Sequence, residues 1–143
     1  MGGWLILALL ASLCYGLFAV VAKLATSSQH GNVAPASATM LMLVGIAVVV
    51  SAYFALSRPT LPTDAQAIGL SVLAGALWAL GAVFVYIALS SGVEVARVAP
   101  VANTNTLVAV IIGILFLKEV PDQQLRVLIG ALLVVIGGVL VSI

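Results

Sequence analysis

Five long runs of apolar residues follow one another along the chain, separated by short polar segments that carry nearly all of the charges. An α-helix needs about 20 predominantly apolar residues to cross the hydrocarbon core of a bilayer. The pattern therefore predicts transmembrane helices over residues of about 4–22, 36–56, 68–90, 98–117 and 127–143. The connections are too short to separate two domains. We expect an all-α integral membrane protein, with residues 1–143 folded as one compact five-helix bundle.

The composition supports a membrane protein and excludes several other classes. Hydrophobic residues make up 64% of the chain and charged residues 6%, whereas soluble domains average about 45–50% and 25%. A chain this short could not bury so much apolar surface in water. The net charge of +1 provides no basic surface for a nucleic acid. Cys14 is the only cysteine, so it forms no intramolecular disulfide and completes no thiolate metal site.

The positive charges are nearly balanced between the two sides of the membrane. Arg58, Lys118 and Arg126 lie on the side of the N-terminus, and Lys23 and Arg97 lie on the other side. Positive residues favour the cytoplasmic side, so the small excess favours an N-terminus inside. The near balance is equally compatible with insertion in both orientations, which would produce an antiparallel homodimer resembling an inverted-repeat transporter.

The fourth span contains the densest group of polar residues at membrane depth. Asn103, Asn105 and Thr106 follow Pro100 within about two turns. Two residues along an unbroken helix is a rotation of about 200°, so Asn103 and Asn105 could not both face one cavity. Either one of them contacts a neighbouring helix, or Pro100 loosens the turn and exposes backbone carbonyls as well. Asn103, Asn105 and Thr106 are candidate solute-binding residues.

The third and first spans each place polar or aromatic side chains on one face. In the third span, Trp78 and Tyr86 share a face with smaller residues at helical spacing. Trp78 could stack against a solute, and Tyr86 is either a second pocket residue or an interfacial aromatic. In the first span, Ser12, Tyr15 and Lys23 fall on roughly one face. Lys23 either extends to water at the membrane boundary or attracts an anionic group of the solute.

The acidic residues occur in loops rather than at membrane depth. Glu94 and Arg97 could form a weak loop ion pair, and Glu119 and Asp122 flank Pro121 in a polar turn. No group of acids, nucleophiles or metal ligands lies within a span, so an intramembrane enzyme is the weakest functional class. The sequence predicts neither a cofactor nor a metal, because it has no phosphate-binding loop and no His/Cys ligand spacing.

Glycines recur in the fifth span, where Gly130 and Gly137 are seven residues apart and Gly138 follows directly. Small residues allow the backbones of two membrane helices to approach closely. The glycines therefore predict either a dimerisation seam or close packing within one bundle.

Four stretches carry a family resemblance that extends over nearly the whole chain: WLILALLASLCYGLFAVVAK, VFVYIALSSGVEVARVAPV, IIGILFLKE and IGALLVVIGGVLV. Their order and spacing resemble the EamA-like five-helix module of the drug/metabolite transporter superfamily. Members commonly join two such modules, so the resemblance implies a homodimer or a heterodimer with a sister subunit. Small multidrug antiporters of the superfamily rely on a first-helix Glu. The first span here contains no acid, so proton-coupled export of cationic drugs by that mechanism is not expected.

The resemblance implies secondary transport of small polar or amphipathic solutes by alternating access between two modules in the inner or plasma membrane. The expected partners are a small-molecule solute, the lipid bilayer and a second module. The alternative is a structural or accessory membrane subunit, in which the polar fourth span would contact a partner.

Overall fold

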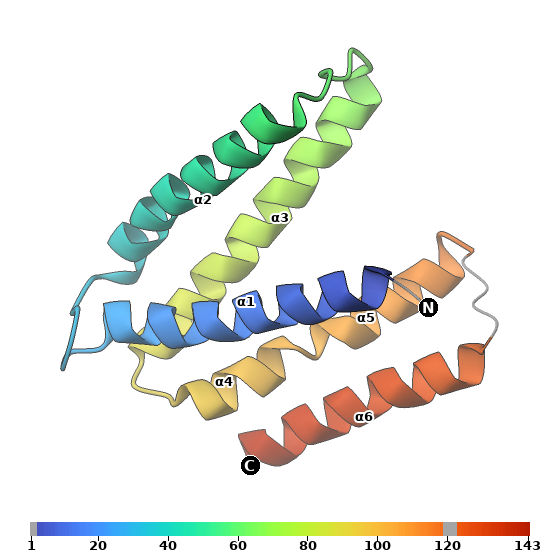
Figure 1. Ribbon diagram of the computed structural model, residues 1–143. Helices are drawn as coiled ribbons and strands as arrows, with labels where there is room; N and C mark the ends of the chain where they lie inside the picture. The colour runs from blue at the N-terminus through green and yellow to red at the C-terminus, as the bar shows by residue number, and fades with distance from the viewer. Residues whose placement is uncertain (1–2, 119–122) are drawn as a thin grey trace. The chain divides into compact units, whose positions relative to one another are not determined.

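A computed structural model describes residues 3–118 and 123–143, and every regular element in this part of the chain is a helix (Figure 1). The helices are α1 (Gly3–Thr26), α2 (Pro35–Ser57), α3 (Ala65–Ser90), α4 (Val95–Ala102), α5 (Asn105–Leu115) and α6 (Gln124–Ser142). Within the described residues, five segments are long and apolar enough to cross a membrane, with α4 and α5 together forming the fourth, Val95–Leu115. The predicted number of spans is confirmed.

The span boundaries differ by a few residues from those predicted, because polar residues form the first turns of some helices. The third span was expected from residue 68, yet α3 begins at Ala65. The Asp64 carboxylate accepts a hydrogen bond from the Ala67 N–H at 2.8 Å, which satisfies a donor at the helix start. Helix α6 begins at Gln124, three residues before the expected start, without a side-chain cap. The apolar pattern located the membrane-embedded lengths rather than the helix ends.

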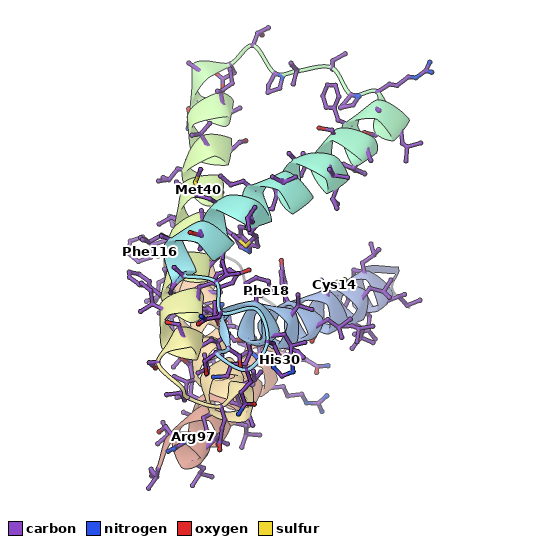
Figure 2. All side chains as sticks on the ribbon, turned by 90° about the vertical axis from the view of Figure 1, so that its left-hand side faces the viewer. Cys14, Phe18, His30, Met40, Arg97 and Phe116 are labelled. Carbon is purple, nitrogen blue, oxygen red and sulfur yellow. The ribbon has the colours of Figure 1, made fainter. Side chains whose placement is uncertain are left out.

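Close contacts divide the chain into two compact units, one comprising Met1–Val20 with Val93–Ile143 and the other comprising Val21–Gly92. In the second unit, α2 and α3 contact each other, and the buried residues lie toward one end of each helix. Ala38 is near the start of α2, whereas Ala82, Tyr86 and Leu89 are near the end of α3. From this contact the two helices diverge toward residues 58–64 (Figure 2).

The loop after α1 is tied to the end of that helix by backbone hydrogen bonds. The Gly31 N–H donates to the Leu24 carbonyl at 3.0 Å, and the Val33 N–H donates to the Ala25 carbonyl at 2.9 Å. A Cβ atom at Gly31 would collide with the Ala25 carbonyl group. Glycine is therefore required here by the close approach of the backbone. The loop folds back against the last turns of α1.

In the first unit, α6 packs along both α4 and α5. The buried residues of α6 are Ala131 and Gly138, seven residues apart, and Gly113 is the buried residue of α5. Small residues at a helix contact allow close backbone approach in a membrane. Gly130 and Gly137 have no other atom within 4 Å of the position a Cβ would occupy. Packing within the unit thus uses Ala131 and Gly138.

Most large apolar side chains are exposed, including Leu7 on α1, Val49 on α2, Leu77 on α3 and Leu133 on α6. Surface of this kind is unfavourable in water and favourable in hydrocarbon. The helices are therefore stabilised with lipid as the solvent for their outer faces.

Candidate functional site

The fourth span is interrupted at Asn103 and Thr104, which separate α4 from α5 (Figure 1). We call these two residues the break. The helical segment before it has eight residues and the segment after it has eleven, corresponding to about 12 Å and 16 Å at 1.5 Å per residue. The break consequently lies near the middle of the span.

Backbone hydrogen bonding changes at the break. The Thr104 N–H donates to Val101 at 3.1 Å and the Thr106 N–H donates to Asn103 at 3.2 Å. Both bonds reach three residues back, as in a 3₁₀ turn, rather than four. The carbonyls of Pro100 and Ala102 therefore do not receive the bond that a continuous α-helix would give them. The missing N–H of Pro100 frees the Ala96 carbonyl instead, so the change at the break comes from the three-residue bonds of Thr104 and Thr106.

The two asparagines at the break have exposed side chains. Within residues 3–118 and 123–143, the side-chain amides of Asn103 and Asn105 take part in no hydrogen bond. An amide at membrane depth without a partner is costly in hydrocarbon. Each of them needs water, a solute or another protein group as a partner, which makes the break the leading candidate site.

The hydroxyls beside the asparagines stabilise the break itself. Thr104 Oγ1 donates to the Val101 carbonyl at 2.7 Å, and Thr106 Oγ1 donates to the Asn103 carbonyl at 2.9 Å. Bonds of this type offer the backbone an alternative to the helical pattern and often bend membrane helices. Thr106 was expected to bind solute, and its donor proton is used within the chain.

The remaining predicted residues are distributed over both units. Ser12 and Tyr15 lie in the same unit as the break and are exposed. Lys23, Trp78 and Tyr86 lie in the other unit. Asn103, Asn105 and Thr106 are the predicted residues that lie together within about one turn.

Lys23 has a defined partner at the end of α3. Its Nζ donates to the Leu89 carbonyl at 2.8 Å, one of the last carbonyls of a helix that ends at Ser90. A cation at a helix C-terminus is favoured by both the hydrogen bond and the helix dipole. Leu89 is 1% exposed, so this bond joins the half-buried Lys23 ammonium to a packed part of the unit.

The face of α3 that carries the two predicted aromatics is divided. Tyr86 and Ala82 are buried, whereas Trp78 is 44% exposed. Ser71 and Gly75, earlier on the same face, are also exposed. The C-terminal part of this face is thus buried in a helix contact, whereas the N-terminal part, including Trp78, is exposed.

Arg97 is a structural residue whose role the sequence did not reveal. Its Nη2 donates to the Ser142 carbonyl at 2.8 Å and its Nε donates to the Val141 carbonyl at 3.3 Å. Figure 2 shows Arg97 beside the C-terminal end of α6. The sequence suggested a loop ion pair with Glu94, but the guanidinium bonds to helix carbonyls instead. Both Lys23 and Arg97 therefore stabilise helix C-termini.

The model of the EamA-like transporter family matches residues 2–143. The chain belongs to the EamA-like transporter family. This match extends over the whole of the described chain and confirms the resemblance in the sequence. No curated protein and no solved structure matches the chain.

EamA membership establishes a multi-pass membrane protein with a transporter-like function in the drug/metabolite superfamily. EamA proteins are transporters rather than enzymes. They are embedded in lipid and bind small solutes. Glu119 and Asp122, the acids expected after the fourth span, lie outside the described residues. Among the residues that are described, no group of three His, Cys, Asp or Glu side chains could hold a metal.

Proposed function

We propose that this EamA-like protein is a secondary transporter of small polar or amphipathic metabolites in the cell membrane, with its solute site at the break in the fourth span. Solute sites in secondary transporters typically lie near the bilayer midplane, at interrupted helices whose unwound backbone and polar side chains contact the solute. The observation that carries this proposal is the pair of amides, Asn103 and Asn105, whose side chains are exposed and take part in no hydrogen bond within residues 3–118 and 123–143.

The amides favour a polar but uncharged contact with the solute. An asparagine side chain offers two N–H donors and one carbonyl acceptor, so the two side chains together suit a solute with both donors and acceptors. Tyr15 and Ser12 are exposed and lie in the same unit as the break, and they are proposed as additional solute contacts. Lys23 and Tyr86 are assigned to packing, because Lys23 binds the Leu89 carbonyl and Tyr86 is buried.

The working unit is proposed to be a dimer of two five-helix modules that alternate access between the two sides of the membrane. Gly130 and Gly137 on α6 support a helix seam to the second module, because the space next to both is open. An antiparallel homodimer fits the near balance of positive charge, and a sister subunit would provide an equivalent module.

The test is solute exchange by the purified protein in proteoliposomes, measured separately with radiolabelled amino acids and nucleosides. With a solute that is exchanged, Asn103→Ala and Asn105→Ala should each raise KM. Loss of a neutral hydrogen bond worth about 0.5–1.5 kcal/mol corresponds to about two- to twelvefold in affinity. Gln66→Ala is the matched control, because it removes an exposed amide from the first turn of α3.

The possible outcomes separate the two functions that the sequence suggested. Exchange that depends on Asn103 and Asn105 but not on Gln66 supports the proposed site. Exchange that is indifferent to both asparagines would refute the site while retaining transport. Exchange of any solute by the isolated protein would exclude the accessory-subunit function, whereas absence of exchange is the result expected both for an accessory subunit and for a module that needs a sister subunit.

A further inference from the structure

The break in the fourth span packs closely against Gly138 of α6. A Cβ atom at Gly138 would lie 2.9 Å from the Thr104 methyl carbon, Cγ2, and 3.0 Å from the Pro100 carbonyl oxygen. Carbon atoms normally approach no closer than about 3.5 Å, so only glycine fits without displacement. At Gly137 and Gly130 nothing lies within 4 Å of that position. Among the glycines of α6, close approach of the neighbouring chain therefore requires glycine at position 138 and not at 130 or 137.

The atoms nearest to the Cβ position at Gly138 belong to Thr104 of the break and to Pro100, about one turn before it. The Thr104 N–H donates to Val101 instead of Pro100, which leaves the Pro100 carbonyl oxygen directed at the hydrogen on the Gly138 Cα. Contacts between a Cα–H and a carbonyl recur where membrane helices pack closely and are weakly favourable. The Thr104 methyl group lies next to the same glycine, and the Thr104 hydroxyl donates a hydrogen bond to the Val101 carbonyl. We call Gly138, Thr104 and Pro100 the seat.

A second contact joins α4 to α6 on the same side. Arg97 and Pro100 are three residues apart on α4, so they lie on the same side of that helix, and Thr104 follows in the break. Arg97 binds the carbonyls of Val141 and Ser142, three and four residues beyond Gly138. Helices α4 and α6 therefore run antiparallel where they are in contact. The α4 segment is fixed to α6 at its start by Arg97 and at its end by the seat.

We propose that Gly138, Thr104 and Arg97 are positioning residues: they hold α4 against α6 and thereby fix the orientation of the Asn103 and Asn105 amides at the solute site. This inference rests on the proposed function of the break. Thr104 lies between the two asparagines, so a displacement of Thr104 away from α6 necessarily changes the backbone that carries both amides.

The test uses the reactivity of a cysteine at the break, which requires no knowledge of the solute. Asn105→Cys is introduced in a Cys14→Ala background, and the rate of reaction with a membrane-impermeant maleimide is measured on the full chain in membranes. Thiols react as thiolates and need water, so reaction reports an aqueous path to the break. Ser57→Cys, at the exposed end of α2, is the reference site in a separate protein.

Gly138→Ala should change the reaction rate at position 105 by about fivefold or more, the effect of a shift of about 1 kcal/mol between two arrangements. Gly137→Ala should leave it unchanged. Thr104→Ser removes the methyl group and retains the hydroxyl, so combining it with Gly138→Ala should restore part of the original rate. The rate at Ser57→Cys should be the same with every seat substitution.

Three results would overturn the inference or its basis, and they are distinguishable. No reaction at position 105 in the parent, with normal reaction at position 57, would refute the aqueous site and thus the proposed function. Reaction that is the same with Gly138→Ala and Gly137→Ala would refute the positioning role alone. If Gly138→Ala does not yield folded protein, Thr104→Ser and Arg97→Gln carry the test, and unchanged rates in both would refute the positioning role.

Discussion

At the residue scale, the two cations Lys23 and Arg97 illustrate how charge is used near a membrane boundary. Each binds carbonyls at the C-terminus of another helix, Leu89 on α3 for Lys23 and Val141 with Ser142 on α6 for Arg97. The last carbonyls of a helix have no partner within it, and leaving them unpaired in hydrocarbon would be unfavourable. The cations supply those partners.

Lys23→Gln should lower the thermal unfolding temperature of the detergent-purified protein. Hydrogen bonds from charged groups contribute about 1.5–3 kcal/mol when partly shielded from water, so a loss toward the lower end is expected for this half-buried lysine. The measurement is thermal unfolding followed by circular dichroism. Arg58→Gln is the control, because its exposed side chain has no hydrogen bond within the described residues. Equal unfolding temperatures for both variants would contradict the role of Lys23.

The sequence predicted the location of Lys23 at the membrane boundary but could not identify its partner. Leu89 is 66 residues away, and its contribution is a backbone carbonyl, which has no signature in the sequence. The partners of Arg97 are also distant backbone carbonyls, so the sequence indicated the nearest acid, Glu94, instead. Local spacing reveals neighbours on one helix, whereas these contacts join different helices.

At the scale of elements, the interrupted fourth span follows from the chemistry of its own residues. Pro100 has no N–H to donate to the carbonyl four residues earlier, and Thr104 and Thr106 bond three residues back. From the proline and the polar residues after it, the sequence left open two alternatives, a contact of one asparagine with a neighbouring helix or a loosened turn. The structure adds that the interruption is at Asn103 and Thr104 and that it packs on Gly138.

Pro100→Ala should stabilise the protein and reduce solute exchange. An interior proline costs a soluble helix about 3 kcal/mol, and contacts at the break compensate part of this, so a gain of about 1 kcal/mol is expected in thermal unfolding. Pro35→Ala is the matched control. Pro35 occupies the first turn of α2, where proline fits, and its replacement should instead cost about 0.4–1 kcal/mol. Destabilisation by both substitutions would contradict this account of the break.

The glycines of α6 mark the limit of prediction from periodicity. Gly130, Gly137 and Gly138 were all expected to lie at a helix contact, and the seven-residue spacing favoured Gly130 with Gly137. In the structure, the buried pair with this spacing is Ala131 and Gly138. Alanine and glycine are both small enough for close packing. The choice between the two faces depends on which residues of α4 and α5 lie opposite, and α6 alone does not contain that information.

At the scale of the whole molecule, the number of spans determines which side each end reaches. Five segments within the described residues are long and apolar enough to cross a membrane, and an odd number of crossings would bring the two ends of the chain to opposite sides. The apolar pattern predicted this number correctly because hydrophobic length is a local property of the chain. Orientation depends instead on a balance of only five positive residues, two on one side and three on the other, and the sequence alone left it open.

Insertion in both orientations predicts that both ends are accessible from outside intact cells. Single cysteines at Gly3→Cys and Ile143→Cys, each in the Cys14→Ala background, should both react with a membrane-impermeant thiol reagent. Reaction after permeabilisation provides the total for each. Reaction of one end alone would refute the antiparallel homodimer and favour a parallel assembly or a sister subunit.

The backbone at Arg58 and Lys118 has a consequence for any attempt to reverse the orientation by moving charges. Both residues have left-handed backbone conformations, with φ of 45° and 55°, which cost L-residues about 1–2 kcal/mol relative to glycine. Replacing either with glycine would remove a topogenic charge and relax the chain simultaneously. Glutamine would remove the charge and retain the conformational cost. Comparing the two substitutions at each site would separate the electrostatic from the conformational contribution to topology, and a charge-deletion series built on glycine alone would confound them.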